Sequence, residues 1–459
     1  MEETKKLNCK LEDNKYLADI FDKVNLVFAF AIILAPILTS LICLVAVEVD
    51  FLIVNLIIYL FFILFKLISF SLNVKFLRFR KLDILEILAI SLFLMLIITE
   101  IINSPVHFNF IFVWGMFLVF FIFIKIDKKY YKSLMYTFIL TLVVCSIMGV
   151  CDLNNSYMPG FLDYTYPMSL QFYHPNYSAY ITTMAIMLCI YVLWTYKTKC
   201  EQIIFWLSYS ILNVCLFING CYSAEFAMFV GELFLLLYLW IKNKKCPWTI
   251  LICMLISIAA SFVWVRGYST SSANFMFESL AVIDGKLGTN LVFNVSTFFD
   301  KIFGTGVISK VAGSDGWDRA SLNEIAFNEI IASPKSFMFG YGKGYNYDIR
   351  VHNIPLQIWL EYGIINLILY LAIYVVLIVR IFKTGFSSHN IFMIALLIAE
   401  VFVCHYFGCF EEYSFTYFIA LFAVFVKSVN EKKIYRKSMQ KENIESESKN
   451  DLKKENYEN

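Results

Sequence analysis

Two basic side chains, Arg350 and His352, stand just before an apolar block that begins near residue 355. An arginine grips a phosphate through the planar fork of its guanidinium group. A histidine can donate to the same anion or transfer a proton near neutral pH. The pair therefore predicts an anion site, whereas an isolated histidine at a helix end would more often be a polar anchor.

Three closely spaced glycines precede this pair in the segment SPKSFMFGYGKGYNYDIRVHN. Gly340, Gly342 and Gly344 allow tight turns or close approach of the backbone to a ligand, and Lys343 adds a charge between them. A glycine-rich loop can cradle phosphate through its backbone N–H groups. A plain turn explains the same glycines, and we favour it over the phosphate cradle.

Acidic residues inside apolar blocks are costly to bury and are therefore functional candidates. Glu225, Glu232, Glu361 and Glu400 could each orient a hydroxyl or act as a base. The alternative is a carboxyl group hydrogen-bonded to a neighbouring helix, which we favour for Glu400. Four further acids stand at the expected outer ends of helices and are predicted to be merely solvated: Asp50, Glu100, Glu411 and Glu412.

The elements that hold these residues must be membrane helices. The chain has 459 residues, of which 60% are apolar and 16% charged, which excludes a disulfide scaffold, a disordered chain and an ordinary cytosolic enzyme. Its 12 Cys are scattered without a CxxC motif, so we expect neither a disulfide framework nor a metal site. Blocks long enough to span a bilayer predict twelve transmembrane helices, at 24–47, 51–71, 84–103, 108–126, 133–151, 177–196, 202–220, 222–241, 248–265, 355–379, 389–406 and 413–427.

The distribution of basic residues orients these helices. With the N-terminus inside, thirty of the 38 Lys and Arg face the cytoplasm, and the other eight all lie in 266–354. The sequence thus predicts an all-α polytopic membrane protein with both termini cytoplasmic. Its expected parts are a cytoplasmic segment, nine helices, a large extracytoplasmic loop, three helices and a disordered cytoplasmic tail, at 1–23, 24–265, 266–354, 355–427 and 428–459.

The large loop is expected to contain short helices. Apolar residues recur at helical spacing in 291–303, which fits either a helix on the membrane surface or one packed on its own loop. A second helix is expected over roughly 319–333, where Asp318 could cap the start and Pro334 follows the end.

The loop resembles the O-antigen ligase/polysaccharide polymerase superfamily, multi-span enzymes with one large outer loop between late spans and a GT-C-like architecture. The family pattern is an arginine opening a loop helix, a proline, a Gly-x-Gly turn, His-Asn and a glycine in the next span. An earlier segment, HPNYSAYI from His174, is similar to the family's entry to a middle span. The matching positions are Arg319, Pro334, Gly340-Tyr341-Gly342, His352-Asn353 and Gly363.

The resemblance implies a metal-independent, inverting glycosyltransferase without a cofactor. Its donor would be a glycan on undecaprenyl diphosphate, and fixed cations would stabilise the departing diphosphate. Arg319 matches the family's loop arginine and would bind the diphosphate. His352 would bind the diphosphate or deprotonate the acceptor. Glu225 joins them as a candidate catalytic residue, and Asn353, Gly342 and His174 as candidate substrate-binding residues.

One departure from the family pattern affects the charges. Where the family often has Ser-Arg-Gly, this chain has Ser223-Ala224-Glu225, so one arginine of the usual pair is missing. The second positive charge could come from elsewhere in the sequence. The alternatives are Arg266, Lys343 and Arg350.

Within this family the expected reaction is polymerisation of capsule, exopolysaccharide or O-antigen repeat units. A ligase that transfers the finished glycan to another acceptor shares the same motifs. A flippase of lipid-linked oligosaccharide is a further alternative, although no internal repeat is evident. The implied partners are the lipid-linked oligosaccharide, membrane lipid, a chain-length regulator and a flippase, and the net charge of +2 indicates no nucleic acid.

Overall fold

The computed structural model describes residues 23–35, 37–38, 51–72, 83–103, 130–150, 175–196, 198–218, 222–267, 319–343, 353–383 and 388–404. In these ranges the regular structure is helical throughout and contains no strand. A helical segment occupies 23–35, and the numbered helices follow it. These are α2 (Phe51–Leu72), α3 (Ile84–Ile102), α5 (Tyr131–Val150), α6 (Pro175–Thr195), α7 (Lys199–Ile218), α8 (Tyr222–Asn243), α9 (Trp248–Gly267), α13 (Arg319–Ile331), α14 (Pro334–Phe339), α15 (Ile354–Lys383) and α16 (Ser388–Cys404).

Most predicted apolar blocks are confirmed as helices, with bounds that differ by a few residues. The predicted loop helix at 319–333 is confirmed as α13, and it ends at Ile331 because Ser333 and Pro334 start a new helix, α14. The predicted span at 355–379 is confirmed as helical but is interrupted at Gly363 in α15. The predicted helices at 108–126, 291–303 and 413–427 lie outside the described residues.

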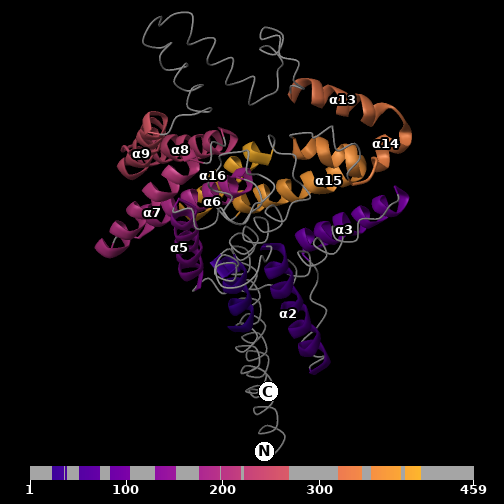
Figure 1. Cartoon of the computed structure of the whole chain (residues 1–459), viewed down its shortest axis with the longest axis horizontal. Coiled ribbons are helices and arrows are strands. Elements are labelled where there is room, and N and C mark those ends of the chain that lie inside the picture. Colours follow the sequence, from indigo (N-terminus) through magenta and orange to yellow (C-terminus); the bar gives the residue numbers. More distant parts are fainter. Residues whose placement is uncertain are drawn as a thin grey trace, which may run out of the picture.

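Two described helices are long and apolar enough to cross a membrane, Ile84–Ile102 and Ile354–Arg380. They pack against each other in opposite directions, since Thr99 near the end of α3 contacts Tyr362, whereas Asp83 at its start is ion-paired with Arg380. Figure 1 shows the pair side by side, with α13 and α14 at one end. The antiparallel pairing places the first residues of α15 and the last residues of α3 at the same end.

Helices α5, α7, α8, α9 and α16 form a bundle around α6, which is buried along most of its length because all five pack against it. Figure 1 shows α6 and α16 between α7–α9 and α15. The apolar core is continuous from α6 to α15, with Tyr191 of α6 and Phe392 of α16 in edge-to-face contact. This core connects the bundle to the α3–α15 pair.

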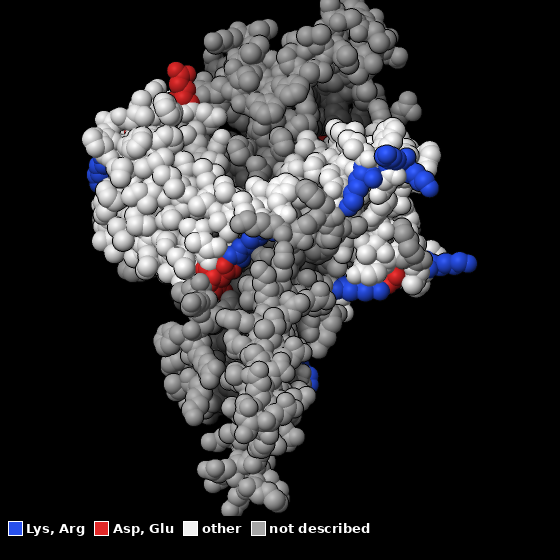
Figure 2. All heavy atoms as spheres, turned by 180° about the vertical axis from the view of Figure 1, so that it is seen from behind, with Lys and Arg blue, Asp and Glu red and all other residues white. Residues whose placement is uncertain are grey.

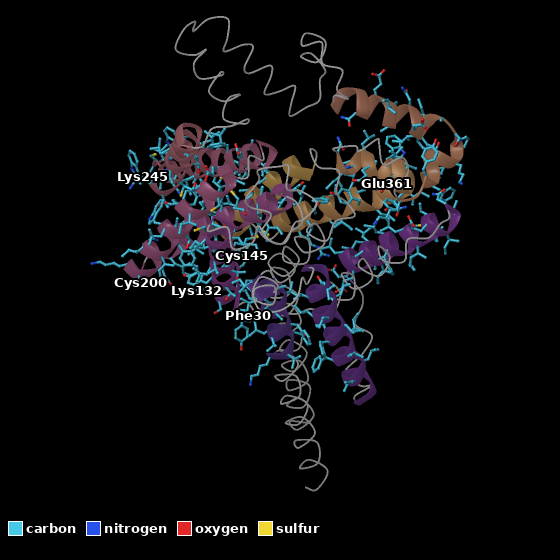
Figure 3. The ribbon with its side chains drawn as sticks, viewed as in Figure 1. Phe30, Lys132, Cys145, Cys200, Lys245 and Glu361 are labelled. Carbon is cyan, nitrogen blue, oxygen red and sulfur yellow. The ribbon has the colours of Figure 1, made fainter. Side chains whose placement is uncertain are left out.

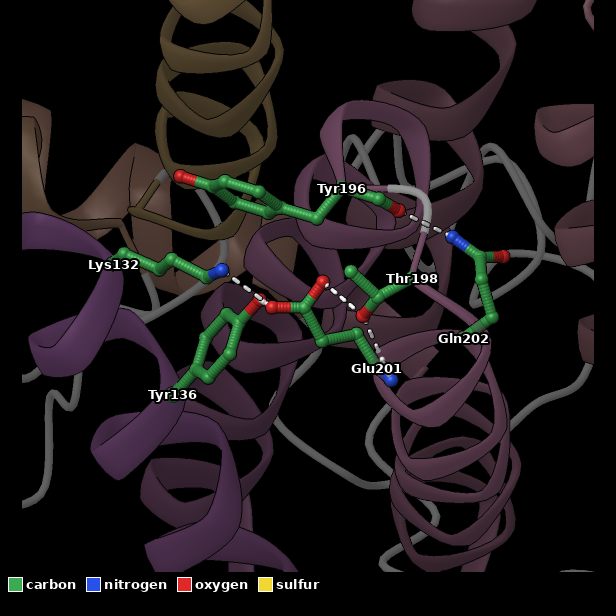
Figure 4. Close-up of polar contacts among 6 residues, drawn as sticks. All are labelled: Lys132, Tyr136, Tyr196, Thr198, Glu201 and Gln202. Carbon is green, nitrogen blue, oxygen red and sulfur yellow. Dashed lines mark hydrogen bonds and ion pairs between the residues drawn. The ribbon is translucent and has the colours of Figure 1, made fainter.

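A polar cluster ties the starts of α5 and α7 together (Figure 4). The carboxylate of Glu201 is ion-paired with Lys132 and accepts hydrogen bonds from Tyr136 at 2.9 Å and from Thr198 at 2.5 Å. Glu201 stands immediately before the predicted span at 202–220. The Lys132 ammonium, with the Thr198 and Tyr136 hydroxyls, lowers the pKa of Glu201 from 4.5 to about 2.

Charged side chains are sparse on the described surface. The space-filling view in Figure 2 shows an almost uncharged face with Lys, Arg, Asp and Glu confined to a few places near its edges. Large apolar side chains stand exposed instead, for example Phe61 of α2 at 61%, Ile101 of α3 at 63% and Val375 of α15 at 56%. Exposed apolar side chains in such numbers are typical of surfaces that contact lipid or another protein.

Candidate functional site

The Gly-x-Gly turn begins where α14 ends. Ser333 caps α14, because its hydroxyl accepts from the Ser336 backbone N–H at 3.0 Å, and Pro334 occupies the first helical position. The six-residue helix stops at Gly340, whose φ of 65° is a left-handed conformation that favours glycine. Local sequence therefore fixes both ends of α14 and the start of the turn.

A break in α15 receives this turn. Gly363 has a φ of 82° inside α15, so the helix is kinked there. The carbonyl groups of Leu360 and Glu361, just before the break, accept from the backbone N–H groups of Tyr341 at 3.0 Å and Gly342 at 2.8 Å. The turn thereby caps the end of the first arm of α15, residues 354–362.

The two glycines at this junction leave no space for a side chain. A Cβ on Gly340 would lie 2.4 Å from the carbonyl carbon and oxygen of Glu361. A Cβ on Gly363 would lie 2.1 Å from the carbonyl oxygen of Met338 in α14. Both obstacles are backbone atoms and cannot rotate away. The junction of α14 and α15 therefore requires glycine on both sides.

The end of α3 completes the junction. The Asn103 side-chain amide donates to the Phe339 carbonyl at 3.0 Å, and Glu100 accepts from the Lys343 backbone N–H at 2.9 Å. Glu100 is only 1% exposed, so the prediction that it is merely solvated is wrong. Lys343 lies close to it in space although 243 residues separate them, a contact that hydropathy does not reveal.

A third link joins α3 to α15 just past the kink. Thr99 donates from its hydroxyl to the Tyr362 carbonyl at 3.3 Å, and Asn366 donates to Thr99 at 3.1 Å and to Tyr362 at 2.7 Å. Thr99 and Asn366 are fully buried. The carbonyl of Tyr362 thus gains two side-chain donors next to the interruption of the helix, which limits the cost of the break.

The first arm of α15 starts with a side-chain cap. The Asn353 carboxamide oxygen accepts from the Leu356 N–H at 3.0 Å. Further along the arm, Gln357 donates to Glu361 at 3.1 Å, and both side chains are buried. Figure 3 shows Glu361 on α15 beside α14. Glu361, one of the four acids singled out above, therefore belongs to this junction.

Aromatic side chains hold α13 against the same arm. The Trp359 indole N–H donates to the Phe337 carbonyl at 3.2 Å, and the Trp359 ring meets those of Phe327 and Phe337 edge to face. Tyr341 reaches the other way and donates from its hydroxyl to the Glu329 carbonyl at 3.0 Å. Helices α13 and α14, the turn 340–343 and the first arm of α15 therefore form one packed unit, which we call the glycine junction.

The backbone of the turn is fully engaged. The N–H groups of Gly340, Tyr341, Gly342 and Lys343 donate to Ser336, Leu360, Glu361 and Glu100. An anion therefore finds no backbone donor at these four positions, which agrees with the interpretation of GYGKG as a turn rather than a phosphate cradle. Gly342 contributes backbone geometry, and Lys343 is the charged residue of the turn 340–343.

The structure brings together some of the predicted site residues. Lys343, Gly342 and Asn353 belong to the glycine junction, and Arg319 is the first residue of α13. Glu225 lies in the first turn of α8, is 6% exposed, and adjoins the contact of Thr183 with the Ala224 carbonyl. The side chains of Arg319 and Arg266 lie outside the described part of the chain, as do His174, Arg350 and His352 entirely.

Sequence reasoning missed four polar residues that build the junction. Thr99, Asn103, Gln357 and Asn366 all make hydrogen bonds there. The available signal was polarity inside or at the edge of apolar blocks, which marks buried polar contacts in membrane helices. In the described residues, no group of three His, Cys, Asp or Glu side chains is placed to hold a metal ion.

Comparison with known proteins gives no relative: no family model matches the chain, and no curated protein matches it.

Proposed function

We propose that this chain is a polysaccharide polymerase of the bacterial cytoplasmic membrane. It joins oligosaccharide repeat units carried on undecaprenyl diphosphate at the outer face of that membrane. In this proposal the chain spans the bilayer twelve times, has both termini in the cytoplasm and exposes the segment 266–354 outside.

The glycine junction is the observation that carries the proposal. Pro334, Gly340, Gly342 and Gly363 are separate positions of the family pattern that the sequence resembles, and in the structure they form one unit. Two of these glycines are required by backbone contacts between α14 and α15. These positions of the family pattern therefore pack together in a structural unit that also contains Lys343 and Asn353.

The contacts at the two ends of α3 fit a helix that spans the membrane. Asp83 pairs with Arg380 at one end, where the cytoplasmic loops are expected, and Glu100 contacts Lys343 at the other end. Seventeen helical residues at 1.5 Å each separate the two contacts by about 26 Å, close to the thickness of the hydrocarbon core. The exposed apolar side chains of α2, α3 and α15 fit contact with lipid.

The proposed reaction is an inverting substitution at the anomeric carbon of the donor glycan. The acceptor hydroxyl oxygen bonds to that carbon, the bond from carbon to the diphosphate oxygen breaks, and the lipid diphosphate leaves with the electron pair. Arg319 and Lys343 neutralise the growing charge, with Arg350 or Arg266 as further cations. His352 or Glu225 takes the proton of the acceptor hydroxyl.

A deletion strain tests the proposal directly. We expect single lipid-linked repeat units to accumulate outside the membrane, and polymer to return when the gene is restored. Units that accumulate on the cytoplasmic side would instead indicate a flippase. Finished polymer that stays on its lipid carrier would indicate a ligase.

A charge-removal pair tests the anion site. Arg319→Ala should abolish polymer, and Lys343→Ala should reduce it, because both remove a cation from the departing diphosphate. Lys335→Ala is the matched control, since Lys335 is an exposed cation of α14 with no assigned role, and it should retain polymer. Normal polymer in both the Arg319 and Lys343 variants would remove the anion site from the proposal.

A further inference from the structure

A second polar network lies inside the bundle, between α7, α8 and α9. The Tyr209 hydroxyl contacts the Glu232 carboxyl group, the Cys253 carbonyl at 2.8 Å and the Ser257 hydroxyl at 2.6 Å. Ser257 in turn lies 2.8 Å from Asn213. All five residues are fully buried, so none of these contacts is shared with solvent.

The number of hydrogens available to this network is small. The Asn213 side-chain N–H donates to the Tyr209 carbonyl at 2.9 Å, so its oxygen faces Ser257, which must donate to it. The Cys253 carbonyl can only accept, so the contact with Tyr209 needs the hydrogen of the Tyr209 hydroxyl. Both hydroxyl hydrogens are then used, and the contact between Tyr209 and Glu232 has none unless Glu232 supplies it.

An ionised Glu232 gives a worse arrangement whichever way the hydroxyls rotate. The four close contacts join Tyr209 to Glu232, to Cys253 and to Ser257, and Ser257 to Asn213. The two hydroxyl hydrogens can fill only two of these contacts, so two pairs of oxygens would have no hydrogen between them. A protonated Glu232 supplies a third hydrogen and leaves only one such pair. Among the residues that the structure describes, the second carboxyl oxygen of Glu232 has no hydrogen-bond partner. The first carboxyl oxygen contacts Tyr209 and Ser257, and neither of these is a cation. An unpaired carboxylate buried in this way is very costly.

We propose that Glu232 is a neutral carboxylic acid that donates its proton to the Tyr209 hydroxyl and thereby fixes α8 against α7 and α9. The other titratable groups in or beside the network are Tyr209, Cys253 and, on α6, Cys189, all of them neutral when protonated. Glu232 is therefore a positioning residue rather than the base that its place in an apolar block suggested.

The fixed position of α8 has a consequence for Glu225, and this step rests on the proposed function. Glu225 precedes Glu232 by seven residues, which is about two helical turns, so the two side chains leave α8 on the same side. Fixing the rotation and height of α8 at Glu232 also fixes them at Glu225. A base that must meet an acceptor hydroxyl needs such a fixed position.

Infrared spectroscopy of the full chain in lipid vesicles tests the protonation state. At neutral pH the wild type should show the carbonyl-stretch band of a protonated carboxylic acid, and Glu232→Gln should lose that band. Glu232→Gln should keep the melting temperature, because the amide supplies both a donor and an acceptor of similar shape. The proposal is overturned if the two spectra show no such difference while the variant is folded.

Activity separates positioning from proton transfer. Polymerisation should survive in Glu232→Gln and fall in Glu232→Ala and Tyr209→Phe, both of which should also melt at lower temperature. A Glu232→Gln protein that melts normally but makes no polymer would overturn the positioning role. Glu225→Gln is the control on the same helix: if it retains activity, Glu225 is not the base and His352 is left in that role, whereas the infrared result for Glu232 stands regardless.

Discussion

The carbonyl oxygen of Met338 faces Gly363 across the contact between α14 and α15, so closely that a Cβ on Gly363 would lie 2.1 Å from it. The contact is possible because Gly363 has no side chain and adopts a φ of 82°, which other residues rarely tolerate. One residue thus permits both the kink in α15 and the approach of the turn that caps it.

Gly363→Ala should therefore disrupt the glycine junction. We expect a loss of at least ~2 kcal/mol of stability, from left-handed backbone strain and from overlap with backbone atoms. Polymer should be lost as well, and the melting temperature of the purified protein measures the first effect. Gly231→Ala in α8 is the matched control: its added Cβ would come close to the flexible end of Met187 and would lie 3.5 Å from the Ala395 carbonyl oxygen, an ordinary contact, so it should melt close to the wild type.

Asn353 can be tested for two distinct roles. Asn353→Ala removes the cap of α15 and should cost about 1 kcal/mol, whereas Asn353→Asp keeps an acceptor for the Leu356 N–H and should melt normally. If Asn353 also binds the donor, Asn353→Asp should be folded yet inactive, because a new negative charge repels the diphosphate. Equal activity of Asn353→Asp and wild type would restrict the residue to capping.

The Glu201 cluster predicts a pH dependence of stability. Its pKa is about 2 in the folded chain and 4.5 otherwise, so the carboxylate stabilises the folded state above about 4.5. That contribution is lost as the pH falls from 4.5 through about 2. Melting temperatures measured over this window should fall less steeply for Glu201→Gln than for the wild type. Parallel curves for the two proteins would show that Glu201 contributes nothing to the acid sensitivity.

The pair Arg380 and Asp83 should couple the far ends of α15 and α3. Each side chain is partly buried, at 16% and 31% exposed, so removing one leaves its partner poorly solvated. Arg380→Ala should cost about 1 kcal/mol or more, and Asp83→Ala combined with it should cost less than the sum of the two. Additive losses in this double-mutant cycle, followed by thermal unfolding, would show that the pair is not coupled.

Hydropathy predicted the helices well because their apolar blocks are local and long. The positions of α3, α8 and α9 follow within two residues from composition alone. The kink at Gly363 did not follow, because a single glycine in an apolar block also fits a regular helix. It depends on contacts with Met338, Tyr341 and Gly342, which lie outside the block.

The acids show the same limit at the level of the site. Glu100 stands at the end of its block and was predicted to be solvated, yet the turn at Lys343 covers it. Glu232 has the same residue type and a similar apolar setting as Glu225, but its environment is set by Tyr209 and Ser257 from other helices. Such differences arise from contacts between distant segments, which a single sequence does not specify.

The four engaged N–H groups of the turn 340–343 have one more consequence. Because this stretch is already tied to α14, α15 and α3, it need not become ordered when a ligand reaches the Lys343 side chain. The conformational entropy of that backbone is lost during folding, so ligand binding causes no further loss there. Binding at the Lys343 side chain would then carry no cost for ordering the turn. The backbone amide hydrogens of residues 340–343 should exchange slowly whether or not the ligand is present.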